Sequence, residues 1–204
     1  TVHRNRERVA DLLAAGATLA ATPAELARGS DIVFLCVTGS PQVEAAVSGP
    51  EGLLAGAAKG LVIVDTSTAE PESTNRLRAL CEAQGVQFVD APLARTPTEA
   101  EAGRLNVMVG ATAAQFALLE PVIRAFAENV FHVGAPGAGH VIKLLNNFIA
   151  QASCTAVAEA FAVGQKAGVD LRQLIALMSA GLVNSGLIQV MAKTLDGDLA
   201  GMKF

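Results

Sequence analysis

Three polar side chains stand at helical spacing in the apolar segment GAGHVIKLLNNFIAQ, residues 137–151. Lys143 and Asn147 are four residues apart and Asn146 is three residues after Lys143, so a helix would place them on one face. A lysine and two amides are costly to bury unless they meet polar partners. Burial lowers the pKa of a lysine, which suits proton transfer near neutral pH. On spacing alone, a solvent-facing stripe with a snorkelling lysine fits equally well.

A second candidate group lies in the segment 89–106, where a predicted strand ends in Asp-Ala-Pro and a polar loop follows. Ligands of open α/β sheets bind beyond the carboxyl ends of the strands. The guanidinium of Arg95 offers two parallel donors to an oxyanion, and Thr96 adds a hydroxyl donor. The alternative is an exposed loop in which Arg95 pairs with Glu99 or Glu101.

Two further strand ends carry small polar residues. The segment VDTST ends at Thr68, and the apolar run DIVFLCV ends in Cys36-Val37 and is followed by Thr38. Hydroxyl groups at these places either cap the next helix or face a bound cofactor. The sequence leaves both interpretations open.

The elements that must hold these groups alternate between strand and helix up to about residue 133. Continuous apolar runs at 31–37 and 61–65 are typical of parallel strands that are covered on both faces. This alternation predicts an α/β fold with a doubly wound parallel sheet. Further strands are expected at 86–90, 105–109 and 130–133, and helices at 6–15, 24–27, 43–47, 72–84 and 113–126.

After residue 134 the pattern is helical only. A long helix is expected over 140–167, and shorter ones over 171–179 and 187–195. We therefore expect a first domain over 1–134 and a helical domain over 135–204. The apolar stretch of the long helix contains several polar side chains, which predicts a helix buried in protein and not a membrane span.

The composition argues against several classes of protein. Lys and Arg number 15 against 19 Asp and Glu, the net charge is −4, and no basic block is present, so nothing favours nucleic-acid binding. Cys36, Cys81 and Cys154 are far apart and odd in number, which is typical of reduced thiols in a cytosolic protein. The 3 histidines have no metal-ligand spacing.

No G-x-G-x-x-G phosphate loop is present in the sequence. The chain begins at Thr1 inside what looks like a strand, and its last residues show no helix stop. We expect both ends to lie inside a longer protein, with the first strand and the glycine loop upstream. We therefore expect that these 204 residues alone do not turn over a substrate.

Four segments, taken in order, resemble the β-hydroxyacid dehydrogenases: LCVTGSPQVEAAV, VDTST, DAPLART and GAGHVIKLLNN. This family includes 3-hydroxyisobutyrate dehydrogenase, tartronate semialdehyde reductase and sulfolactaldehyde reductase. The similarity runs through essentially the whole chain, and the Gly-x-Gly-x-x-x-Lys-x-x-Asn-Asn pattern at Gly137–Asn147 is specific to the group. The resemblance implies a Rossmann-type domain that binds NAD or NADP, followed by an all-helical domain.

The resemblance also implies roles for individual residues. Lys143 would be the catalytic lysine with Asn147 beside it, and Asn146 and Asn147 would hold the substrate. Cofactor contacts would fall on Val37, Thr38 and Thr68.

Residues 4–6, Arg-Asn-Arg, stand where the family binds the ribose of the cofactor. No Asp or Glu is present there to take a 2′-hydroxyl, and arginine suits a 2′-phosphate. Arg4 is therefore a candidate cofactor contact, and the choice between the two cofactors leans to NADP.

The substrate loop departs from the common family sequence Asp-Ala-Pro-Val-Ser-Gly-Gly. The serine that would grip a substrate carboxylate is Ala94 here, and the two glycines are Arg95 and Thr96. An Arg-Thr pair resembles the sulfolactaldehyde reductase branch, where it engages a sulfonate. That branch also has a serine one turn after the asparagine pair, where this chain has Ala150, so the acid group stays open.

We therefore predict an NAD(P)-dependent oxidoreductase that transfers a hydride between the nicotinamide and a small β-hydroxy acid or semialdehyde. The alternative is a catalytically silent paralogue that acts as a binding or dimerisation module. The presence of both Lys143 and Asn147 argues against it. We further expect a cytoplasmic homo-oligomer with a small acidic substrate and with no nucleic-acid or membrane partner.

Overall fold

The computed structural model describes residues 1–3 and 5–199, and the chain divides into two compact units. Unit 1 comprises Thr1–Ala94 and Gly103–Lys143, and unit 2 comprises Arg95–Ala102 and Leu144–Phe204. These units do not test the domain ranges expected from the sequence, 1–134 and 135–204, which stay predictions.

Unit 1 is built on a sheet in the order β1-β2-β3-β5-β4, and β6 also pairs with β5. β1, β2 and β3 run parallel, whereas β5 runs antiparallel to β3 and parallel to β6. The predicted parallel pairing is confirmed for β1, β2 and β3, and β5 departs from it, because residues 91–104 reverse the chain instead of crossing over the sheet. The strands are β1 (Ile32–Leu35), β2 (Val62–Asp65), β3 (Gln87–Asp90), β4 (Leu93–Ala94), β5 (Leu105–Gly110) and β6 (Ala127–Gly134).

The predicted alternation of strands and helices is confirmed. Proline stands in the first turn of α2, α3 and α4, where its missing N–H leaves no hydrogen bond unmade. The sequence did not indicate the two-residue strand β4 or the short helix α5. The helices are η1 (Arg6–Val9), α1 (Ala10–Ala14), α2 (Pro23–Arg28), α3 (Ser40–Ser48), η2 (Leu53–Ala55), α4 (Pro71–Ala83), α5 (Pro97–Glu101), α6 (Ala113–Ile123), α7 (Ala138–Lys166), α8 (Leu171–Ala180) and α9 (Gly186–Thr194).

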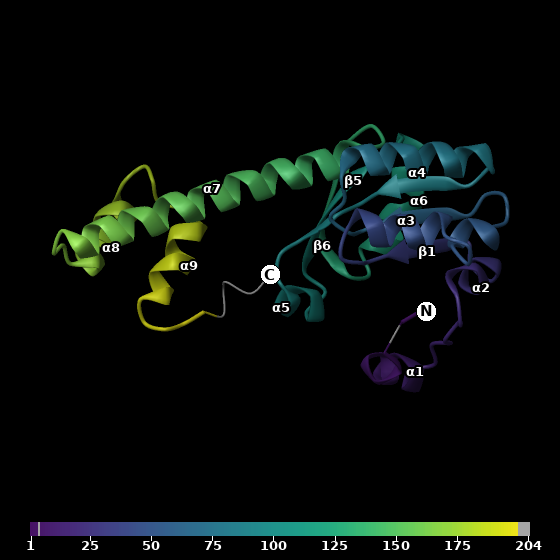
Figure 1. Cartoon of the computed structure of the whole chain (residues 1–204), viewed down its shortest axis with the longest axis horizontal. Coiled ribbons are helices and arrows are strands. Elements are labelled where there is room, and N and C mark those ends of the chain that lie inside the picture. Colours follow the sequence, from purple (N-terminus) through teal and green to yellow (C-terminus); the bar gives the residue numbers. More distant parts are fainter. Residues whose placement is uncertain (4, 200–204) are drawn as a thin grey trace. The chain divides into compact units, whose positions relative to one another are not determined.

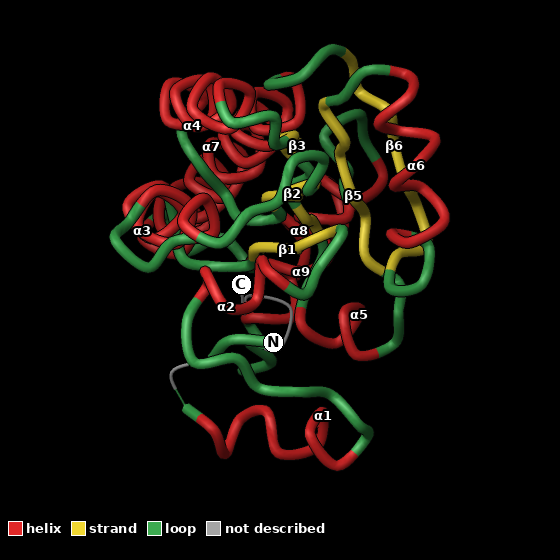
Figure 2. The backbone as a smooth tube through the Cα atoms, turned by 90° about the vertical axis from the view of Figure 1, so that its right-hand side faces the viewer, coloured by secondary structure: helices red, strands yellow, loops and turns green. Residues whose placement is uncertain are grey.

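The sheet of unit 1 is covered on both faces, as Figure 2 shows with α3 and α4 on one side and α6 on the other. Successive residues of a strand point to opposite faces. Ile63 of β2 accordingly packs into the core under α3 and α4, and its neighbours Val62 and Val64 pack into the core under α6. The doubly wound arrangement predicted from the apolar runs is confirmed.

The strand expected at the start of the chain is not formed. Thr1 makes two backbone contacts, from its N-terminal amine to the Thr18 carbonyl and from the Ala20 N–H to its own carbonyl, each 2.8 Å long, but residues 1–3 have no strand assignment. Arg4, the candidate ribose contact, lies outside the described residues. β1 is consequently an edge of the sheet within the part of the chain that the structure describes.

α7 is the one described helix that is long and apolar enough to cross a membrane by length and composition alone, a test that core helices of soluble proteins also pass. The prediction that it is buried is wrong for this chain. Leu145, Phe148 and Ile149 are 59%, 65% and 63% exposed. The reason is that the buried core of unit 2 is small and lies where α8 and α9 pack against the far part of α7 (Figure 1).

Candidate active site

Asp90, the last residue of β3, holds the first turn of α7. Its Oδ1 accepts the Gly137 N–H at 2.6 Å and its Oδ2 accepts the His140 N–H at 3.1 Å. The first N–H groups of a helix have no partner within the helix, and a carboxylate satisfies both their hydrogen bonds and their positive potential. Burial raises the pKa of Asp90, while the two N–H groups and His140 act in the opposite direction.

The Gly-x-Gly pair before the helix has a steric explanation in the structure. Gly137 has φ +97°, a conformation that side chains disfavour. A Cβ on Gly139 would lie 2.6 Å from the Met108 carbonyl oxygen and 2.7 Å from Asp90 Oδ2. The space around Gly110 is equally restricted, since a Cβ on this residue would lie 2.6 Å from Asp90 Oδ2. These glycines let the start of α7 approach β3 and β5 closely enough to reach Asp90.

Lys143 is half-buried and follows this locked turn. Desolvation by burial lowers the pKa of its ammonium group. Because α7 is continuous from Ala138 to Lys166, the exposed Asn146 and the half-buried Asn147 lie on the same helical face as Lys143. A lysine with a lowered pKa beside two amides can donate or accept a proton while the amides orient an oxygen-bearing ligand.

The structure brings the three candidate cofactor contacts together at the carboxyl end of β1 and β2. The Val37 N–H donates to the Ser67 hydroxyl at 3.0 Å, and a Cβ on Gly39 would lie 3.9 Å from the Thr68 carbonyl oxygen. Val37 and Thr38 line a cavity of about 650 Å³ that also runs along β1. The side chains of Val37, Thr38 and Thr68 are exposed. A small apolar residue beside hydroxyl groups, at a strand end with a cavity next to it, fits a nucleotide.

The substrate loop is unusual in its backbone. Ala94 ends β4 opposite Asn106 of β5. Arg95 has φ 84° and is the one described residue other than glycine in the left-handed region. This conformation costs a side-chain-bearing residue roughly 1–2 kcal/mol. Thr96 caps α5, because its hydroxyl donates to the Glu99 carboxylate and its N–H donates to the same oxygen at 3.1 Å.

Sequence reasoning missed the buried polar residues that organise this site. Asp65 and Asp90 lie opposite each other in the register of β2 and β3, and both are buried, as is His140. The sequence signal for them is that two neighbouring apolar strands, VIVD and QFVD, each end in aspartate. An acid directly after a buried strand has to find a donor.

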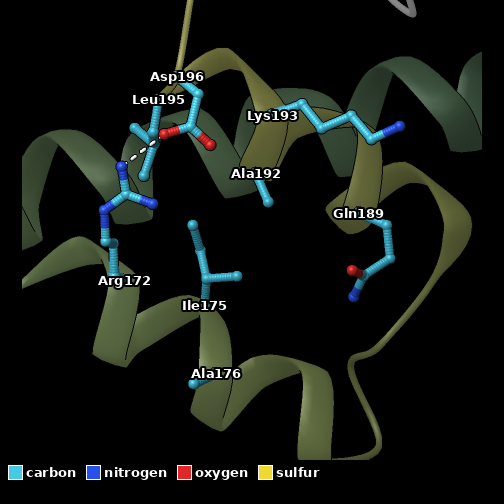
Figure 3. A pocket seen from close by; sticks show the side chains of 8 residues that line it. All are labelled: Arg172, Ile175, Ala176, Gln189, Ala192, Lys193, Leu195 and Asp196. Atoms are coloured by element: carbon cyan, nitrogen blue, oxygen red, sulfur yellow. Dashed lines mark hydrogen bonds and ion pairs between the residues drawn. The ribbon is translucent and has the colours of Figure 1, made fainter. Parts of the chain in front are cut away.

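A separate cavity of about 320 Å³ lies between α8 and α9 in unit 2 (Figure 3). Arg172 at its rim is paired with Asp196. None of the residues predicted from the sequence line this cavity. Residues 1–3 and 5–199 contain no group of three or more His, Cys, Asp or Glu side chains suited to hold a metal ion.

Comparisons with known proteins agree with this geometry. Residues 1–134 match the family described as the NAD binding domain of 6-phosphogluconate dehydrogenase. Residues 137–200 match the family described as NAD-binding of NADP-dependent 3-hydroxyisobutyrate dehydrogenase.

Individual relatives show the same similarity over most of the chain. The chain is 34% identical to 2-(hydroxymethyl)glutarate dehydrogenase of Eubacterium barkeri, over 95% of this chain and 65% of the relative. It is 29% identical to 3-sulfolactaldehyde reductase of Escherichia coli (strain K12), over 96% of this chain and 66% of the relative. The structure of Mycobacterium tuberculosis 3-hydroxyisobutyrate dehydrogenase with L-serine matches with a TM-score of 0.83 and 25% identity, over 91% of this chain and 63% of the other.

The chain therefore spans about two thirds of the length of these relatives. The first family match alone covers more than half of the chain, and the locked start of α7 with Lys143 carries the motif that indicated the same family from the sequence. The chain belongs to the β-hydroxyacid dehydrogenase family.

Proposed function

We propose that this chain forms the cofactor site and the proton-transfer site of an NAD(P)-dependent oxidoreductase that acts on a small β-hydroxy acid or semialdehyde. One observation carries the proposal: the half-buried Lys143, whose pKa is lowered by desolvation, follows a helix start that Asp90 holds with two hydrogen bonds. When bound, NAD(P) supplies or accepts the hydride. Lys143 donates a proton to the substrate oxygen during reduction and takes it back during oxidation, and Asn147 orients that oxygen.

The cofactor role is assigned to the first domain, residues 1–134. Val37, Thr38 and Thr68 bind the dinucleotide at the strand ends, supported by the hydrogen bond that joins their loops and by the neighbouring cavity. Arg4 contacts the 2′-phosphate of NADP, a role supported by the absence of an acidic residue at positions 4–6.

The substrate role is assigned to Ala94, Arg95 and Thr96 together with Asn146 and Asn147. Backbone strain that persists in a folded protein is concentrated at functional sites, and Arg95 carries such strain. Its guanidinium suits a carboxylate or a sulfonate, which defines the substrate as a small acid. The Thr96 hydroxyl donates to Glu99, and Arg95 supplies the cationic group of this loop.

We also propose a cytoplasmic homo-oligomer. The exposed apolar residues of α7, Leu145, Phe148 and Ile149, support it, because large apolar patches on soluble proteins mark interaction surfaces. The same face supports the second candidate function, a catalytically silent module for dimerisation within the helical domain, residues 135–204. That alternative gives no role to Lys143 and Asn147, which share one face of α7.

The test is an assay of the full-length protein with NADH and NADPH against short semialdehydes that carry a carboxylate, a sulfonate or no acid group. We expect oxidation of the cofactor with the acidic aldehydes only, and faster oxidation of NADPH than of NADH. Nucleotide binding without turnover of any aldehyde would instead support the silent module.

A further inference from the structure

His140 is fully buried in the first turn of α7 and contacts three other elements of unit 1. Its Nδ1 lies 2.7 Å from the Thr74 hydroxyl on α4, and its Nε2 lies 3.2 Å from the Ser67 carbonyl oxygen after β2. Its backbone N–H donates to Asp90 at the end of β3. A single residue thus ties the start of α7 to α4, β2 and β3.

The partners of the imidazole determine which nitrogen carries a hydrogen. The Ser67 carbonyl only accepts hydrogen bonds, so Nε2 must be a donor. Asp65 stands beside it: Oδ1 accepts the Ser67 N–H at 2.9 Å, and the buried Oδ2 has no hydrogen-bond partner among the described residues and lies 3.8 Å from Nε2. A buried carboxylate oxygen without a donor is costly, and the Nε2 hydrogen that donates to the Ser67 carbonyl also lies near this oxygen.

This contact connects the two halves of the proposed active site. Ser67, which accepts from Nε2, also accepts the Val37 N–H through its hydroxyl at 3.0 Å. On the other side, Lys143 follows His140 by three residues in the same helix. His140 therefore lies between the loops assigned to the cofactor and the lysine assigned to proton transfer, all within unit 1.

We propose that His140 is a positioning residue that sets the place of Lys143 relative to the strand-end loops carrying Val37, Thr38 and Thr68. The proposal rests on the proposed function, because it gives His140 its effect through proton transfer by Lys143. His140 itself is fully buried, and its contacts are with Ser67, Thr74 and Asp90. Small errors in the placement of a reacting group lower rates by up to about 10²-fold, so such a role is measurable.

Two near-isosteric variants separate positioning from simple filling of space. The side-chain nitrogen of glutamine reaches the place of Nε2, whereas that of asparagine reaches only the place of Nδ1. We expect His140→Gln to keep kcat near the wild-type value in the full-length protein. We expect His140→Asn and His140→Ala to lower kcat about 10- to 100-fold with KM for the acid little changed. The control is His132→Gln, since His132 stacks on Phe116 and contacts the Ala111 carbonyl away from these groups.

A double-mutant cycle with Lys143→Ala tests the connection directly. If His140 acts through Lys143, adding His140→Asn to Lys143→Ala lowers kcat no further than Lys143→Ala alone. Additive losses would overturn the inference and leave the proposed function intact, whereas a near-normal Lys143→Ala enzyme would overturn the proposed function itself. Hydrogen exchange of the Gly137 and His140 amides gives a readout without activity: both exchange faster in the Asn variant than in the Gln variant. Equal kcat in the Gln and Asn variants would also overturn the inference.

Discussion

Two consecutive parts of α7 lie in contrasting surroundings. At its start, Asp90 accepts two N–H groups, and Gly139 leaves no room for one additional methyl group. Further along, Leu145, Phe148 and Ile149 are mostly exposed although they are large and apolar. Lys143 is the last residue of unit 1 and lies between these two parts of the helix, four residues after the tightly packed Gly139.

The two units also differ in the size of their buried apolar cores. Unit 1 buries two apolar clusters, one on each face of its sheet. The corresponding cluster of unit 2 is limited to Val157, Phe161, Ile188 and Met191, with partly buried neighbours. Since the burial of apolar surface is the main favourable term in folding, the described core of unit 1 contributes more to stability than that of unit 2.

The largest effect is expected from a matched pair of truncations, one in each region. Leu119 is 0% exposed under the sheet of unit 1, and Phe148 is 65% exposed on α7. Leu119→Ala should lower the free energy of unfolding by about 2–5 kcal/mol. Phe148→Ala should change it by less than about 0.5 kcal/mol. Urea unfolding at low protein concentration measures both values, and a comparable loss for Phe148→Ala would show that the apolar face of α7 is covered.

The second prediction concerns the residue at the junction of the two regions. Lys143→Ala should lower kcat of the full-length protein by at least about 10²-fold, the usual contribution of a general acid. Cofactor affinity should change little, because the residues assigned to the cofactor lie in other loops. The matched control is Lys166→Ala, an exposed lysine in the last turn of the same helix. Near-normal kcat in Lys143→Ala would remove this residue from the mechanism.

Much of unit 1 could be predicted from the sequence because its signals are local. The runs DIVFLCV and LVIVD are apolar throughout, and that pattern is sufficient to identify buried strands with helices between them. The direction of β5 was not predictable in this way. An apolar run indicates a buried strand, but it does not indicate whether that strand is parallel or antiparallel to its neighbour in the sheet. β4 has only two residues, Leu93 and Ala94, and therefore has no periodicity to detect.

The prediction of the site has the same limit, because sequence patterns indicate local structure but not long-range contacts. The spacing of Lys143 and Asn147 is local and indicates a shared helix face, but Asp90 reaches Gly137 across 47 positions of sequence. The burial of α7 was predicted wrongly. An apolar composition indicates that a helix gains stability from being buried, but it does not indicate which part of the protein covers the helix. The roles of the site residues, from Val37 to Asn147, stay predictions.

The third prediction uses the strained residue of the substrate loop. Arg95→Ala should raise KM for the acid, with kcat/KM about 10- to 100-fold lower, and should leave KM for NAD(P)H unchanged. Arg95→Gly should lose the same binding while increasing the free energy of unfolding, because glycine adopts φ 84° without strain. Steady-state kinetics with acidic and neutral aldehydes separates the roles. A mutant that keeps its preference for acidic aldehydes would show that Arg95 has only a structural role.

The fourth prediction tests how tightly the start of α7 is packed. Gly139→Ala places a methyl group 2.6 Å from the Met108 carbonyl oxygen, so the helix start has to move. Overpacking of this kind costs typically about 1–3 kcal/mol, measured as a lower free energy of unfolding. Gly29→Ala is the matched control, because its Cβ would meet nothing within 4 Å. Equal stability of the two variants would contradict the close approach of α7 to β5.

The smallest effect is expected from a surface contact that joins α3 to α4 within unit 1. Glu44 accepts hydrogen bonds from the Ser73 hydroxyl at 2.6 Å and from Arg76 at 2.5 Å, and these two contacts lower its pKa from the ordinary value of 4.5. For a carboxyl group whose pKa is lower in the folded state, the stabilisation is present above pH 4.5 and is lost as the pH falls through the lower, folded value.

Glu44→Gln should therefore be slightly less stable than the wild type at neutral pH, and the difference should vanish in acid. Thermal unfolding between pH 3 and pH 7, about the range in which carboxyl groups titrate, measures it, with Glu51→Gln as the control. A difference that stays constant across this range would show that the contact does not depend on the charge of Glu44.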